Sequence, residues 1–117
     1  MSKADGGAAT DLRVILSTTP DASSAGTLAR ALVDERLAAC VTAVPGARST
    51  YREQDAVKVA DEVVLVIKTT AAMAPALAVR LAEMHPYAIP EVIILAPVEG
   101  AAPYVTWLLA SVGPSAP

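Results

Sequence analysis

Two runs of apolar residues constrain the fold of this chain more than any other feature. They are residues 63–67 (VVLVI) and 92–95 (VIIL), and their β-branched composition is typical of buried strands. Successive side chains of a strand point to opposite faces of its sheet, so each run places apolar side chains on both faces. Any sheet built from these strands must therefore be covered on both sides.

The remaining patterns predict the element order β-α-β-β-α-β-α. Thr19 is predicted to cap the first helix with Pro20 at its first position, and Pro45-Gly46 is predicted to bend the second strand. A connection around residues 52–56 would join the second and third strands as a long hairpin. The predicted strands are residues 11–18, 39–51, 57–69 and 90–98, and the predicted helices are residues 19–34, 73–85 and 102–112.

This order predicts an α+β fold of the ferredoxin-like type, a split β-α-β sandwich. Its two main helices can cover only one face of a four-stranded sheet, so the other face of a monomer should be polar. Leaving four or five Val, Leu or Ile side chains in water would cost about 1.5–3 kcal/mol each, against a total stability of about 5–15 kcal/mol. We therefore expect a homo-oligomer with closed symmetry.

Length, composition and charge limit the number of domains and the classes of binding partner. At 117 residues and 12.0 kDa the chain fits one domain, residues 11–112, with a disordered tail at 1–10 and a flexible tail at 113–117. It has no membrane-length apolar run and no secretory signal, so we expect a cytoplasmic protein without a membrane span. Nine Lys and Arg residues, spread thinly under a net charge of -3, argue against nucleic acid as a partner.

The single histidine and the single cysteine are the strongest candidates for catalysis or metal binding. His85 is either a helix-terminal residue that bonds the last carbonyls, or a ligand or base assisted by Tyr87 and Glu91. Cys40 is either a small buried residue or a thiolate ligand. One cysteine cannot form an internal disulfide, and with one histidine it cannot complete a zinc site. A strong metal site would need carboxylates or other subunits.

Other residues give weaker signals, each with a structural alternative. Lys68 would meet an anionic ligand or pair with a carboxylate, and Tyr104 and Trp107 are expected to be packing anchors. The chain has no phosphate loop and no GxSxG, HExxH or CxxC motif, so we expect that it is not an enzyme. The remote alternative is an acid-base enzyme built on His85, Glu91 and Tyr87. Four acidic residues near the hairpin tip are expected to form a solvated patch or a hard-cation site: Glu53, Asp55, Asp61 and Glu62.

Several motifs, taken in order, resemble the CutA divalent-cation tolerance family over about residues 12–112: RLAACVTAVPG, STY, VVLVIKT, HPYAIPE and YVTWL. The resemblance implies a ferredoxin-like subunit, a PII-like homotrimer, a cytoplasmic setting and a link to copper and other divalent metals, with no obligatory cofactor. It also implies metal ligands and cleft residues. The metal ligands would be Cys40, His85 and Glu91, and the cleft residues Tyr51, Arg52, Lys68 and Tyr87.

The hairpin departs from the family pattern. Glu53, Asp55 and Ala56 stand where the family has tryptophan, glycine and lysine, and Thr42 stands where asparagine is common. These changes alter the ligand cleft but leave the apolar strands of the trimer in place. We therefore predict a non-enzymatic, trimeric metal-response protein that binds divalent ions weakly between subunits. The alternative is a PII-like module that senses a small anion or a partner protein.

Overall fold

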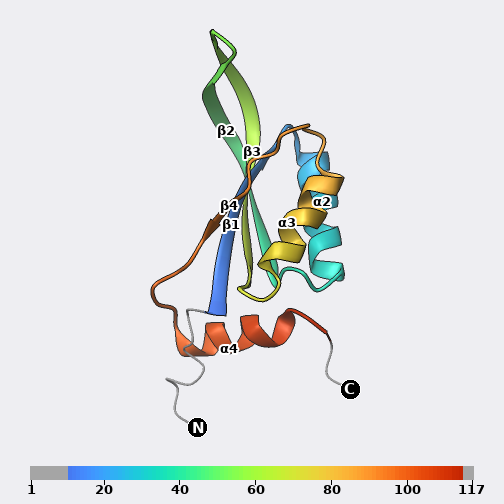
Figure 1. Ribbon diagram of the computed structural model, residues 1–117, viewed down its shortest axis with the longest axis vertical. Helices are drawn as coiled ribbons and strands as arrows, with labels where there is room; N and C mark the ends of the chain where they lie inside the picture. The colour runs from blue at the N-terminus through green and yellow to red at the C-terminus, as the bar shows by residue number, and fades with distance from the viewer. Residues whose placement is uncertain (1–10, 115–117) are drawn as a thin grey trace.

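The computed structural model describes residues 11–114, in which a four-stranded antiparallel sheet is packed with three helices (Figure 1). The strand order is β2-β3-β1-β4. This architecture confirms the predicted α+β, ferredoxin-like fold. The elements are β1 (Leu12–Thr19), α2 (Ala22–Asp34), β2 (Cys40–Glu53), β3 (Ala56–Thr70), α3 (Ala74–Met84), β4 (Ile93–Leu95) and α4 (Ala102–Ser111).

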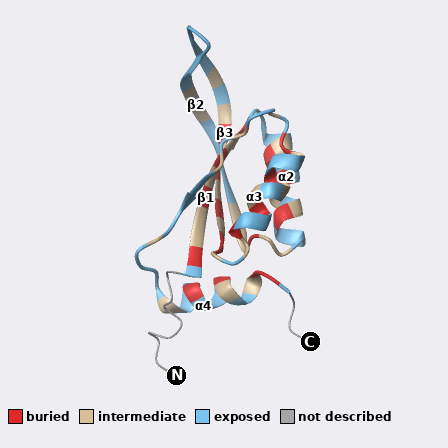
Figure 2. Cartoon of the chain, viewed as in Figure 1, coloured by how far each residue is buried: buried red, intermediate tan, exposed pale blue. Residues whose placement is uncertain are grey.

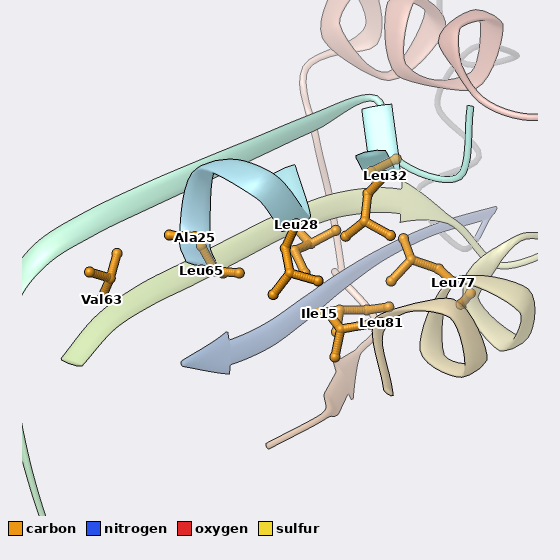
Figure 3. Packing of buried hydrophobic residues seen from close by; sticks show 11 residues of the cluster. Ile15, Ala25, Leu28, Leu32, Val63, Leu65, Leu77 and Leu81 are labelled. Carbon is orange, nitrogen blue, oxygen red and sulfur yellow. The ribbon is translucent and has the colours of Figure 1, made fainter. Parts of the chain in front are cut away.

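One face of the sheet carries the hydrophobic core, because α2 and α3 both pack against it (Figure 3). From the sheet, alternate residues of the two central strands point into this core, among them Ile15 and Leu65, which are fully buried. Leu28 of α2 and Leu81 of α3 meet them from the helices. The helical spacing of these leucines therefore places both helices on the same side of the sheet.

The opposite face is largely apolar, and residues 11–114 leave most of it uncovered (Figure 2). Helix α4 covers only its end, through Val105 and Leu108 packed on Leu12. Ile93 and Leu95 are 47% and 44% exposed. The apolar side chains that share this surface, called the open face below, are Val14, Leu16, Val44, Val64, Val66, Ile93 and Leu95, and Thr18, Thr42 and Lys68 lie on it beside them. The expectation that apolar side chains occupy both faces is met.

Strands β2 and β3 continue past the sheet as a long hairpin arm (Figure 1). The ladder shifts register between Val44 and Ala47, where Gly46 has a φ of 83°, a value that suits glycine. This bulge confirms the predicted bend at Pro45-Gly46. The connection is shorter than the predicted residues 52–56, because Glu53 pairs with Ala56 and leaves a two-residue turn.

Two predicted boundaries are wrong. Thr19 remains in β1, and the N-cap of α2 is Asp21, whose carboxylate accepts a hydrogen bond of 2.7 Å from the Ser24 amide. Strand β4 spans only three residues instead of the predicted 90–98. Pro90 and Pro97 flank it, and proline has no amide hydrogen to donate to a ladder.

The C-terminal end of the described chain is fixed to the α2–β2 connection. The Gly113 amide donates to the Arg36 carbonyl at 2.8 Å, and the Arg36 guanidinium donates to the Ala110 carbonyl at 3.0 Å. Gly113, the first residue of the predicted flexible tail, is therefore buried and bonded. Residues 115–117, and the predicted tail at 1–10, lie outside the described residues.

Replacing Gln54 with glycine is expected to stabilise the protein by about 0.5–1 kcal/mol. Gln54 has a φ of 55° at the hairpin tip, where a side chain costs about 1–2 kcal/mol. Glycine removes this strain but adds about 0.5–1 kcal/mol of chain entropy to the unfolded state. Urea unfolding measures the change. Asp55→Gly is the control, because Asp55 does not have a positive φ and should lose stability instead.

Candidate functional site

A groove of about 1010 Å³ runs between the hairpin arm and the loop 86–91. The walls come from the end of β1, from both strands of the arm and from the HPYAIPE segment that follows α3. Polar side chains line much of it, namely Thr18, Ser49, Tyr51, Glu53, Glu62, Tyr87 and Glu91. The groove therefore brings together Tyr51, Tyr87 and Glu91 of the predicted site residues.

His85 fixes the turn that forms one wall of this groove. It is the C-cap of α3 and is buried. Its Nδ1 accepts a hydrogen bond of 3.0 Å from the Tyr87 amide, and its Nε2 lies 2.7 Å from the Thr18 carbonyl, which can only accept. Both nitrogens of a neutral ring are thus engaged, which favours the turn-residue interpretation. The bonded carbonyl belongs to β1 rather than to the last turn of α3.

Glu62 forms the floor of the groove together with Tyr87. The Tyr87 hydroxyl donates a hydrogen bond of 2.7 Å to the Glu62 carboxylate. Partial burial acts to raise the pKa of Glu62, but hydrogen bonds from Ser49, Tyr87 and Thr18 outweigh it and lower that pKa. Glu62 therefore stays ionised inside the groove. It is not the solvated loop residue that the sequence suggested.

Tyr87 is expected to ionise near pH 12, well above its usual range. Burial and the adjacent Glu62 carboxylate both disfavour the phenolate and raise the pKa of Tyr87 to about 12. A raised pKa means that the contribution of Tyr87 to folding is complete below pH 10 and is lost as pH rises toward about 12. The absorbance of phenolate, compared between the wild type and Tyr87→Phe, measures this. A difference curve centred near 10 would contradict the contact with Glu62.

Two of the predicted site residues lie at the other end of the sheet. Cys40 and Lys68 are cross-strand partners. Lys68 Nζ donates to the Thr42 hydroxyl at 2.6 Å and to the Val66 carbonyl at 3.1 Å. His85 contacts Thr18, which is the cross-strand partner of Val64. Lys68 lies four residues further along β3 than Val64, a distance of about 13 Å. Within one chain, Cys40 and His85 therefore do not share a site.

The remaining predicted residues lie around the groove or outside it. Glu91 is exposed on the groove and has no hydrogen-bond or ion-pair partner among the residues that the structure describes. Arg52 follows Tyr51 in β2, so its side chain points to the opposite side of the arm. Tyr104 and Trp107 contact each other, with ring centroids 5.6 Å apart, but both are about half exposed and are not packed into the core.

The acidic residues of the arm do not form a metal site within one chain. Glu53 pairs with Lys58 at 2.6 Å, and Asp61 pairs with Arg48 at 3.1 Å. Within residues 11–114 no three His, Cys, Asp or Glu side chains are grouped so that they could hold a metal ion. A metal site built from the described residues would therefore require ligands from more than one subunit, or fewer than three such side chains.

The split β-α-β order, the sheet covered by helices on one side and the projecting arm define a ferredoxin-like protein of PII-like architecture. The chain belongs to the CutA1 divalent ion tolerance protein family, whose family model matches residues 13–111. The fold and the order of its motifs agree with that assignment. None of the helices in the described part of the chain has the length and apolar character needed to cross a membrane.

Individual relatives support this membership. The divalent-cation tolerance protein CutA of Thermus thermophilus is 45% identical over 100 residues, which are 86% of this chain and 97% of the relative. The protein of the same description from Pectobacterium atrosepticum is 44% identical over 101 residues, 86% of this chain and 92% of the relative. The crystal structure of CutA from Xylella fastidiosa superposes with a TM-score of 0.86 at 45% identity, covering 88% of this chain and 99% of that one.

Proposed function

We propose that this protein is a non-enzymatic, cytoplasmic homotrimer of divalent-metal tolerance, which binds divalent ions such as Cu²⁺ weakly at clefts between its subunits. The open face is the observation that carries the proposal. Its seven apolar side chains lie side by side on all four strands, and the described part of the chain covers them only at one end. Membership in a divalent ion tolerance family supports the link to metals.

The two edges of the sheet support a closed assembly. Strands β2 and β4 are the edge strands, and all three residues of β4 are exposed. Unpaired edges invite pairing with another chain. Contact between two different edges is head-to-tail, and such contacts form a ring when the rotation closes. A ring of three would turn the open faces inward and bring the arm groove of one subunit next to its neighbour.

The proposed metal ligands are Cys40, His85 and Glu91, supplied by more than one subunit. Glu91 is exposed and has no partner within residues 11–114, so its carboxylate can bind a cation. His85 would first have to release the Tyr87 amide or the Thr18 carbonyl. Cys40 lies at the far end of the sheet from both, beside Lys68. A site whose ligands must first rearrange is expected to bind metal weakly.

Calorimetric titration with Cu²⁺ tests the proposed ligands. Removing a ligand, as in Cys40→Ala, His85→Ala or Glu91→Gln, is expected to weaken binding at least about tenfold. Glu83→Gln is the matched control, because Glu83 lies on α3 and contacts only Arg80, at 3.7 Å. Circular dichroism establishes that each variant is folded. Wild-type affinity in all three ligand variants would reject these residues.

One observation favours the alternative, a PII-like module that senses a small anion or a partner protein. Among the described residues the ammonium group of Lys68 bonds only neutral oxygens and pairs with no carboxylate, so it can bind an anionic ligand at that end of the open face. Arg52 is the second cation proposed for this role. A thermal-shift screen separates the two functions, because the alternative requires larger shifts with anionic metabolites than with metal ions.

A further inference from the structure

The groove between the arm and the loop 86–91 carries an excess of negative charge. Its lining contains three carboxylates, those of Glu53, Glu62 and Glu91, and no Lys or Arg side chain among the described residues. Lys58 neutralises Glu53 from outside the lining. Glu62 is ionised and accepts hydrogen bonds from neutral hydroxyl groups, and Glu91 has no partner in the described part of the chain. An anion would find no cationic partner on the walls of this groove.

The carboxylates are spread along the groove instead of converging on one point. They come from the arm, from the floor and from the loop, and no three such groups in the described chain are placed to hold a single ion. Apolar residues line the groove as well. Ile89 is 90% exposed on the loop, and Pro86 and Pro90 flank it along the groove. The walls thus combine anionic and apolar surface.

Aromatic rings add to the attraction for cations. Tyr51 lines the groove from the arm and is 42% exposed, and Tyr87 lines it from the loop. The faces of such rings attract ammonium groups. The hydroxyl of Ser49 supplies a further acceptor for N–H donors.

We propose that this groove binds a linear aliphatic polyamine. Its ammonium groups would bond Glu91 on the loop and Glu62 on the floor, and its methylene segments would lie against Ile89 and the two prolines. The groove, at about 1010 Å³, is at the upper end of the range for small-molecule sites and is much larger than one metal ion requires. The inference deepens the proposed function by naming a ligand class for the cleft, but it needs the groove of one subunit only.

Calorimetric titration with spermidine at low ionic strength tests the inference on the assembled protein. The wild type is expected to bind, and Glu91→Gln to bind about tenfold more weakly, because a charge-assisted hydrogen bond is lost without a change of shape. Tyr51→Leu is expected to lose about threefold through the missing ring. Glu83→Gln removes the same charge from the surface of α3 and should leave the affinity unchanged.

Each other outcome overturns the inference. Equal losses in Glu91→Gln and Glu83→Gln would mean that spermidine responds only to net charge. Butylamine or Mg²⁺ binding as tightly as spermidine would mean that the length of the groove is not used. Tighter binding of a tetralysine peptide would point to a protein partner. Failure of the inference stays distinct from failure of the proposed function, because the mass of the assembly and its Cu²⁺ affinity are measured separately.

Discussion

Replacing Leu16 with aspartate is expected to convert the assembly into single chains. Leu16 lies on the open face of β1, and its cross-strand partners there are Val66 of β3 and Ile93 of β4, both apolar. In the proposed trimer this face would be buried, so each aspartate would lose its water without gaining a cation. An unpaired buried carboxylate costs several kcal/mol, and the trimer would contain three of them.

Sedimentation equilibrium measures this effect, and Val79→Asp is its control. Val79 is 61% exposed on α3, away from the open face, so the same charge there should leave the mass of the assembly unchanged. Circular dichroism should show that Leu16→Asp keeps its helices, because the core under α2 and α3 is untouched. A Leu16→Asp variant with the mass of the wild type would show that the open face is not the interface.

Replacing Leu28 with alanine is expected to be the most damaging change within a single subunit. Leu28 of α2 is 1% exposed and is packed among residues of α3 and the sheet (Figure 3). Truncating a leucine at such a position leaves a cavity and lowers the free energy of unfolding by about 2–5 kcal/mol. That is a large share of the roughly 5–15 kcal/mol by which a domain of this kind is stable.

The matched control for Leu28 is on the same helix. Val33 is 39% exposed, and Val33→Ala removes less buried surface at a site where alanine also favours the helix. Its effect should stay below about 1 kcal/mol. Denaturant unfolding at one fixed protein concentration compares the two, since assembly contributes to the apparent stability. Equal losses of unfolding free energy in Leu28→Ala and Val33→Ala would show that Leu28 does not lie in the core.

Local sequence patterns predicted the fold well because its elements depend on short-range periodicity. The apolar spacing of both main helices and the run at residues 63–67 identified the strands, the helices and their order. The boundaries were less predictable where two residues compete for one role. Thr19 and Asp21 can both cap a helix, and only the pairing of Thr19 with Val63 keeps it in β1.

The candidate site could be predicted only in part, because its central contacts are not local. Tyr87 and Glu91 were identified from their own segment, but the hydrogen bond from Tyr87 to Glu62 joins residues 25 positions apart. Glu62 lies opposite Ala47, next to the bulge, so the register that brings it to the groove was not visible from the sequence. A carboxylate directly before a buried apolar run is the one local signal that pointed to it.

The mass of the protein in solution is the decisive measurement, because the proposed metal clefts between subunits require copies of the chain to cover the open face. Sedimentation equilibrium at micromolar concentration is expected to give about 36 kDa, three times the 12.0 kDa of one chain. A single species of 12.0 kDa would contradict the account, since the apolar open face would then be stable in water.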